Sequence, residues 1–199
     1  MRIRFVLLAS VLLFLLTACK GAQEATPPPG QPEFRLTASI KDIMDSIVDP
    51  SADELWQSVS TVVDATGTHE KFPRTDEEWK EVRRSAIRLV EGTNLLVMPG
   101  RHVAKPGEKS ENPGIELEPA EMETLINNDR ATFYKLAQAL HEKALVTLQA
   151  IDAKDKDALL DSGNAIDQAC ENCHLKYWYP NEAKAQEEYR KAVEPPKRP

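Results

Sequence analysis

The sequence run that most constrains this chain is Cys170–His174, which reads Cys-x-x-Cys-His. Two thiols three residues apart, followed directly by an imidazole, form the attachment signature of c-type haem. Residues i, i+3 and i+4 share one face of a helix, so both sulfurs can add to the two vinyl groups along one haem edge. His174 can then turn its ring toward the iron as the proximal ligand. The motif therefore predicts one covalent haem c, held on a helix by Cys170 and Cys173.

Two other uses of paired cysteines fit the sequence less well. A redox pair of the thioredoxin type would need a βαβ context, and the pattern around this motif is helical. A zinc site would need two further ligands of suitable type, and the one remaining cysteine, Cys19, lies near the N-terminus. Haem attachment is therefore the interpretation that the residues favour.

The N-terminus has the pattern of an export signal. Arg2 and Arg4 precede an apolar run over residues 5–16, which is shorter than the roughly 20 residues of a membrane-spanning helix. The run ends in Leu-Thr-Ala-Cys, which resembles a bacterial lipoprotein box, and the alternative is a plain secretory signal that contains a cysteine. We expect lipidation of Cys19 and a lipid anchor on the periplasmic side of a bacterial membrane. Lys20 favours the outer membrane.

This compartment agrees with the motif, because bacterial c-type haems are attached outside the cytoplasm. We expect four segments along the chain: a signal peptide (1–18), a Pro- and Gly-rich tether (19–33), a haem-binding domain (34–180) and a polar tail (181–199). The formal charge of −7 argues against nucleic acid and anionic lipid as partners. For an electron carrier, this charge favours a basic redox partner protein.

From residue 34 onward the apolar spacing is helical, with almost no alternating strand signal. The expected helices cover about 34–48, 50–67, 75–97, 119–151 and 155–178, and residues 75–78 have the pattern of a capping box at the start of the third. Asp49 and Pro50 should end the first helix and start the second, since Asp suits an N-cap and Pro the first helical position. The long loop before Pro119 is unusual for a helix connection, and such loops are often functional.

These segments predict an all-α fold. The expected architecture is an antiparallel four-helix bundle with an extra short helix after the first helix and a C-terminal tail. No acid–base constellation is evident, so we do not expect an enzyme.

A haem motif on the last helix of such a bundle resembles the class II c-type cytochromes, the cytochrome c prime family. The family's Cys-x-x-Cys-His-x-x-Tyr element matches Cys170, Cys173, His174 and Tyr177, while Trp178 stands where the family usually has Arg. The resemblance covers 34–178 and implies a monohaem cytochrome. It also allows a homodimer that pairs through the first helices.

The resemblance also bears on the distal side of the iron. In this family the distal residue lies on the first helix: a methionine there gives six-coordinate electron carriers, and an apolar residue gives a five-coordinate iron that binds small gases. Met44 lies mid-helix on the apolar face and is the expected distal ligand; its thioether would stabilise ferrous iron. The alternative is that Met44 only fills core volume.

Other residues carry weaker expectations. Tyr177 and Trp178 follow His174 by three and four residues and are expected haem neighbours. The candidates for pairing with the haem propionates are Arg35, Arg101 and Lys176. The residues expected in packing or surface roles are Met98, Met122, His102 and His141.

Together these features predict a lipid-anchored electron-transfer protein with one His/Met-ligated haem. Two alternatives stay open. The first is a five-coordinate haem protein that binds nitric oxide or carbon monoxide. The second is a structural cytochrome subunit of a larger respiratory or photosynthetic complex.

Overall fold

The computed structural model describes residues 34–182 and 184. The chain divides into two compact units, Met1–Arg35 and Leu36–Pro199, and the first unit contributes only its last two residues to the described part. The predicted signal peptide, the tether and the lipidation site at Cys19 lie outside the described residues, as does most of the predicted tail. No helix of the described part is both long and apolar enough to cross a membrane.

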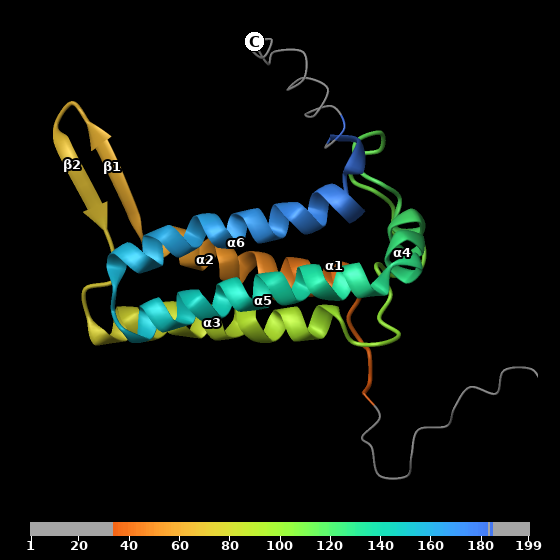
Figure 1. The fold of residues 1–199 in the computed structure, drawn as a ribbon, viewed down its shortest axis with the longest axis horizontal. Coiled ribbons are helices and arrows are strands. Elements are labelled where there is room, and N and C mark those ends of the chain that lie inside the picture. The colour runs from red at the N-terminus through yellow and green to blue at the C-terminus, as the bar shows by residue number, and fades with distance from the viewer. Residues whose placement is uncertain (1–33, 183, 185–199) are drawn as a thin grey trace, which may run out of the picture. The chain divides into compact units, whose positions relative to one another are not determined.

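The second unit is a bundle of helices with one small hairpin (Figure 1). Its elements are α1 (Ile40–Ile43), η1 (Met44–Val48), α2 (Asp49–Ser58), β1 (Ser60–Asp64), β2 (Gly67–Lys71), α3 (Asp76–Leu96), α4 (Pro119–Asn128), α5 (Arg130–Asp152) and α6 (Lys156–Tyr177). Helix α5 packs against α3 and α6, and the N-terminal arm α1–η1–α2 packs against α3 and α6. The prediction of an all-α four-helix bundle is confirmed, with the hairpin as an addition.

The N-terminal arm is one continuous helix, so the expected break at Asp49 and Pro50 is wrong. Asp49 has helical angles (φ −62, ψ −49), and its N–H donates to the carbonyl of Met44, five residues back, in a π-helical turn. Proline has no N–H, and its ring needs distance from the carbonyl four residues earlier. The wider π turn directly before Pro50 relieves both constraints, and the helix continues into α2.

The expected helix through residue 67 is also wrong. Helix α2 ends at Ser58, and β1 pairs antiparallel with β2, with Val62 opposite His69. Val62 and Val63 are 54% and 75% exposed, so they do not belong to a buried helical face. β-branched residues favour strands, and the following turn is closed by Asp64, whose carboxylate accepts the N–H of Thr66 at 2.7 Å.

The longest predicted helix is divided at Asp129. The backbone there leaves the helical region (φ −142, ψ 57), and the Asp129 side chain caps α5 by accepting the N–H of Thr132 at 3.1 Å. Helix α4 consequently turns away from the axis of α5 and lies at one end of the bundle (Figure 1). This break supplies one wall of the site described below.

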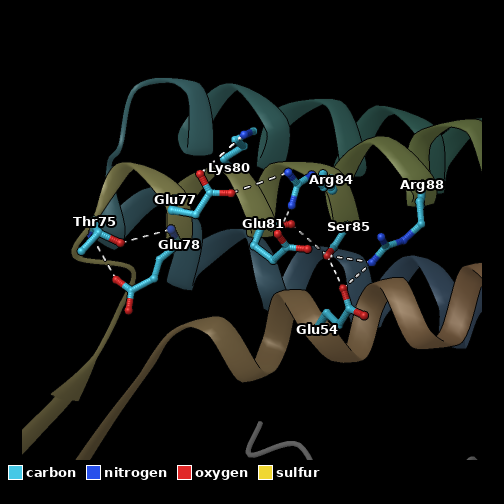
Figure 2. Close-up of polar contacts among 9 residues, drawn as sticks. All are labelled: Glu54, Thr75, Glu77, Glu78, Lys80, Glu81, Arg84, Ser85 and Arg88. Atoms are coloured by element: carbon cyan, nitrogen blue, oxygen red, sulfur yellow. Dashed lines mark hydrogen bonds and ion pairs between the residues drawn. The ribbon is translucent and has the colours of Figure 1, made fainter.

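Polar contacts on the outer face join α2 to α3 (Figure 2). The predicted capping box is present: Glu78 N–H donates to the Thr75 hydroxyl at 3.2 Å, and Thr75 N–H donates to the Glu78 carboxylate at 2.9 Å. Farther along α3, Ser85 and Arg88 both donate to the carboxylate of Glu54 on α2. These contacts fix the N-terminal arm beside α3.

Two adjacent leucines on α6 test the register of this helix. Leu159 is 1% exposed and Leu160 is 37% exposed. Leu159→Ala should lower the free energy of unfolding by about 2–5 kcal/mol, because it leaves a cavity in the core, whereas Leu160→Ala should cost about 1 kcal/mol or less. Urea denaturation followed by circular dichroism measures both. Equal losses would contradict the register of α6.

Candidate haem site

A cavity lies at the end of the bundle where α1, α4, α5, α6 and the loop 97–118 meet. It contains about 1250 Å³ of space, part of it open to solvent. Its walls are mainly apolar; those from α4 and α5 include Met122, Ile126, Phe133, Leu136 and Leu140. An apolar wall excludes water, which is what a haem site requires to set its potential.

The three motif residues line this one cavity. Cys170, Cys173 and His174 lie at i, i+3 and i+4 on α6, and all three belong to the cavity wall. The imidazole of His174 packs edge-on against the ring of Trp178, with 4.9 Å between ring centroids. The arrangement places two thiols and one imidazole toward the same apolar space.

The pKa values of the two thiols and the imidazole bear on the choice between haem attachment and thiol redox chemistry. Burial raises the pKa of Cys170 to about 12 and that of Cys173 to about 11. Reactive redox cysteines have a lowered pKa and act as thiolates, so this pair lacks the environment of a disulfide oxidoreductase. Burial also lowers the pKa of His174, which favours the neutral imidazole that binds metals.

Met44 reaches the same cavity from the N-terminal arm. It begins the π-helical turn η1, and such turns are frequent at functional sites. Met122 on α4 also lines the cavity. The sequence indicated only a packing role for this residue. Met98 does not line it; its sulfur lies 3.2 Å from the guanidinium of Arg101.

The two aromatic residues after the motif have different surroundings. Tyr177 is buried and packs edge-on against Phe133 at 5.5 Å between centroids. Its hydroxyl lies 3.5 Å from the carbonyl of Asp129, at the break between α4 and α5. Trp178 is partly exposed and contacts the imidazole of His174. Both line the cavity, and their contact with a haem stays a prediction.

None of the three residues expected to pair with propionates lines the cavity. Arg101 is 9% exposed, and its guanidinium donates to the backbone carbonyls of Leu95, at 2.7 Å, and Ala38. Lys176 lies 3.8 Å from the carboxylate of Asp129. Arg35 is exposed and belongs to the first unit.

Two lysines that the sequence did not single out do line the cavity. Lys41 pairs with Glu111 at 2.6 Å, and Lys109 lies 3.8 Å from Oε2 of Glu118. That oxygen is buried and has no hydrogen-bond partner among the described residues. The lysines come from α1 and from the loop, which meet only in the folded chain, so no local pattern could identify them.

The loop 97–118 is an ordered wall of the site. The carbonyls of His102 and Val103 accept the N–H groups of Ile40 and Lys41, each at 2.9 Å, which gives partners to donors that a helix start leaves free. At the other end, Leu117 N–H donates to the carbonyl of Trp178 at 2.8 Å. The loop therefore joins the start of α1 to the end of α6 across the cavity.

Two of the three histidines outside the motif, His102 and His141, have partners away from the cavity. His102 pairs with Glu123 at 2.7 Å, and the ring of His141 lies 2.8 Å from the hydroxyl of Thr93. Neither residue lines the cavity. Both keep the surface or packing roles expected for them.

Comparison with known proteins finds similarity in fold. No family model and no curated protein matches the chain. Among solved structures, a nitric oxide complex of a mutant cytochrome c prime from Alcaligenes xylosoxidans is 21% identical and covers 74% of this chain and 99% of that one, with a TM-score of 0.44. A ferrous variant of the same protein with bound nitric oxide is 20% identical and covers 74% and 98%, with a TM-score of 0.45. A further cytochrome c prime is 20% identical and covers 73% and 99%, with a TM-score of 0.44.

Arg101 offers a test of the loop's construction. Arg101→Ala should lower the free energy of unfolding by about 1–3 kcal/mol, because the partly buried carbonyls of Ala38 and Leu95 each lose a charged donor. Arg35→Ala, at an exposed position, should change it by about 0.5 kcal/mol or less. Urea titration measures both, and redox titration of each variant is the second readout. A shifted reduction potential with an unchanged free energy of unfolding would contradict this structural role and would support pairing of Arg101 with the haem propionates.

Proposed function

We propose that the chain is a monohaem c-type cytochrome. Cys170 and Cys173 would hold the haem through thioethers, and His174 would be the proximal iron ligand. The observation that carries this proposal is that the three side chains share one helical face on the wall of a single apolar cavity. A bound haem supplies one-electron chemistry or binding of a small ligand. The protein's part is to orient the imidazole and exclude water.

The residues present fit such a group. The walls are mainly apolar, the two thiols have the spacing of the motif, and burial raises the pKa of both thiols and lowers that of the imidazole. Lys41 and Lys109 provide positive charge among the lining residues, which suits the two carboxylates that a haem carries. These lysines replace Arg35, Arg101 and Lys176 as our candidates for pairing with the propionates.

The first candidate role is electron transfer with Met44 as the distal ligand. Met44 and His174 reach the cavity from different arms of the bundle, the N-terminal arm and α6. A thioether opposite an imidazole raises the reduction potential of the iron. The π turn that starts at Met44 gives this part of the helix a local geometry distinct from the α-helical turns around it.

The second candidate role is reversible binding of a small gas by a five-coordinate iron. Nitric oxide is the ligand named for two of the similar structures above. This role requires Met44 to be only an apolar wall, and Met44 does pack against the hydrophobic core. The cavity is compatible with both roles, and they differ in whether sulfur binds the iron.

We further propose that the protein is tethered by a lipid on Cys19 to the periplasmic face of a membrane, more specifically the outer membrane. The support is the lipobox pattern before Cys19 and Lys20 after it. An exported protein is also exposed to the machinery that attaches c-type haem. A structural place in a larger complex would use the same tether, with its partners retained after mild detergent extraction.

Paired methionine variants separate the two roles. If Met44 binds the iron, the wild type should be low-spin with a Met–iron charge-transfer band, and Met44→Ala should become high-spin and bind carbon monoxide promptly. Met122→Ala, which removes the other methionine of the cavity wall, should leave the spectrum low-spin. Visible spectra of the ferric and ferrous forms provide the measurement. A high-spin wild type that binds carbon monoxide at once would establish the gas-binding role instead.

The lipid anchor has a separate test. Cys19→Ser should move the protein from the membrane fraction to the soluble periplasm, because the acyl chains that hold it are lost. Its haem content should be unchanged, since Cys19 takes no part in attachment. Fractionation with haem staining of denaturing gels measures both properties. Wild type and variant that are equally soluble would show that the signal is a plain secretory one.

A further inference from the structure

A second hollow lies between α2 and α6, and the proposed haem site does not use it. It contains about 700 Å³ of space, much of it open to solvent, and its lining includes Leu55 and Trp56 of α2 and Leu160, Gly163 and Asp167 of α6. We call these five residues the seam groove. It neighbours the haem cavity along α6, because Asp167 lies one turn before Cys170 on this helix.

Trp56 forms the apolar centre of the seam groove. Its indole N–H donates to the carbonyl of Gly163 at 3.1 Å. A Cβ atom at Gly163 would lie 3.2 Å from Cδ1 of Trp56, so the glycine allows the ring to lie close against the backbone of α6. The ring remains 36% exposed, and Leu160 beside it is 37% exposed. A positioned aromatic side chain that is still partly exposed is typical of an anchor in a protein interface.

The surroundings of the groove are negatively charged. Segments 44–59 and 157–175 supply most of its lining and contain no Lys or Arg. Their eight carboxylates are Asp45, Asp49, Asp53, Glu54, Asp157, Asp161, Asp167 and Glu171. Two of these have basic partners from outside the segments, Glu54 with Arg88 and Asp157 with Lys156. Within residues 34–182 and 184, no Lys or Arg forms an ion pair with Asp49, Asp53 or Asp167. On α3, by contrast, acidic side chains have basic partners, as Glu77 has with Arg84 (Figure 2).

These carboxylates face the haem motif from both helices. Burial is the main cause that raises the pKa of Cys170, and the negative charges of Asp49 on the N-terminal arm and of Asp167 on α6 add to it. Asp49 also lines the haem cavity, and Asp167 lines the groove. The groove and the first haem-attaching residue therefore lie one turn apart on α6, with carboxylates of both α2 and α6 near them.

We propose that the seam groove is the docking surface for a redox partner protein whose own contact face has a basic rim around an apolar centre. This proposal rests on the proposed function, because a redox partner requires that this chain carries a haem. Complementary charge would steer the encounter, and Trp56 would supply the buried contact. A second copy of this chain would bring the same carboxylates face to face, and anionic lipid or nucleic acid would be repelled.

The test uses the full haem-loaded protein with mitochondrial cytochrome c, a strongly basic haem protein, as the probe. Lysine-acetylated mitochondrial cytochrome c has the same fold without the positive rim and is the matched control probe. Stopped-flow absorbance measures the rate of electron transfer between the two proteins as ionic strength rises. We expect a rate that falls with salt for the basic probe, and a slower, nearly salt-independent rate for the acetylated one.

Variants of this chain locate the contact. Asp167→Asn and Trp56→Ala should each slow electron transfer by about 3-fold or more, while Trp56→Phe, which keeps an aromatic ring, should have a smaller effect. Glu142→Gln removes the same charge as Asp167→Asn from an exposed position on α5 and should leave the rate unchanged. The haem spectrum and thermal melt of each variant confirm that the fold is intact.

Each outcome has one meaning. Rates for Asp167→Asn and Trp56→Ala equal to that of Glu142→Gln, with intact haem spectra, would overturn the docking surface alone. A homodimer in analytical ultracentrifugation that dissociates on Trp56→Ala would assign the groove to a second copy and also overturn it. A wild type without covalent haem would overturn the proposed function and, with it, the redox role of this surface.

Discussion

The site depends on one constraint: both cysteines and the histidine of the motif must face the same apolar space. Helix α6 meets it through the 3.6-residue repeat, which places Cys170, Cys173 and His174 on one face. That face lines a cavity whose other walls come from the N-terminal arm, α4, α5 and the loop 97–118. A shift of α6 by one or two residues would turn the thiols toward solvent or into packed side chains.

Two departures from regular helix build the rest of the cavity. The break at Asp129 frees α4 to lie at the end of the bundle, where Met122 and Ile126 join the wall. The π turn from Met44 lets the helix continue through Pro50, and that methionine joins the wall of the cavity from the N-terminal arm. Backbone bonds from the loop to Ile40 and Lys41 then hold the start of this arm in place.

The sequence predicted what depends on local pattern. The Cys-x-x-Cys-His spacing, the capping box at Thr75 and the amphipathic spacing gave the bundle and the bounds of α3 and α6 closely. Its misses have identifiable causes. Val62 and Val63 fit a helical repeat, but β-branched residues before an Asp-x-x-Gly turn favour a hairpin. Asp129 lies inside a long apolar pattern, which hides its role as the N-cap of α5. The lysines at the cavity could not be found, because loop and helix meet only after folding.

The most direct test of the central claim is the intact mass of the purified, exported protein, followed by mass spectrometry of the peptide that contains Cys170–His174. We predict that this peptide carries the added mass of one haem, that the lipid proposed for Cys19 adds its mass to a different peptide, and that neither Cys170 nor Cys173 reacts with a thiol reagent. Unmodified thiols, or a disulfide between Cys170 and Cys173, in protein made by a host competent in haem attachment would contradict the account.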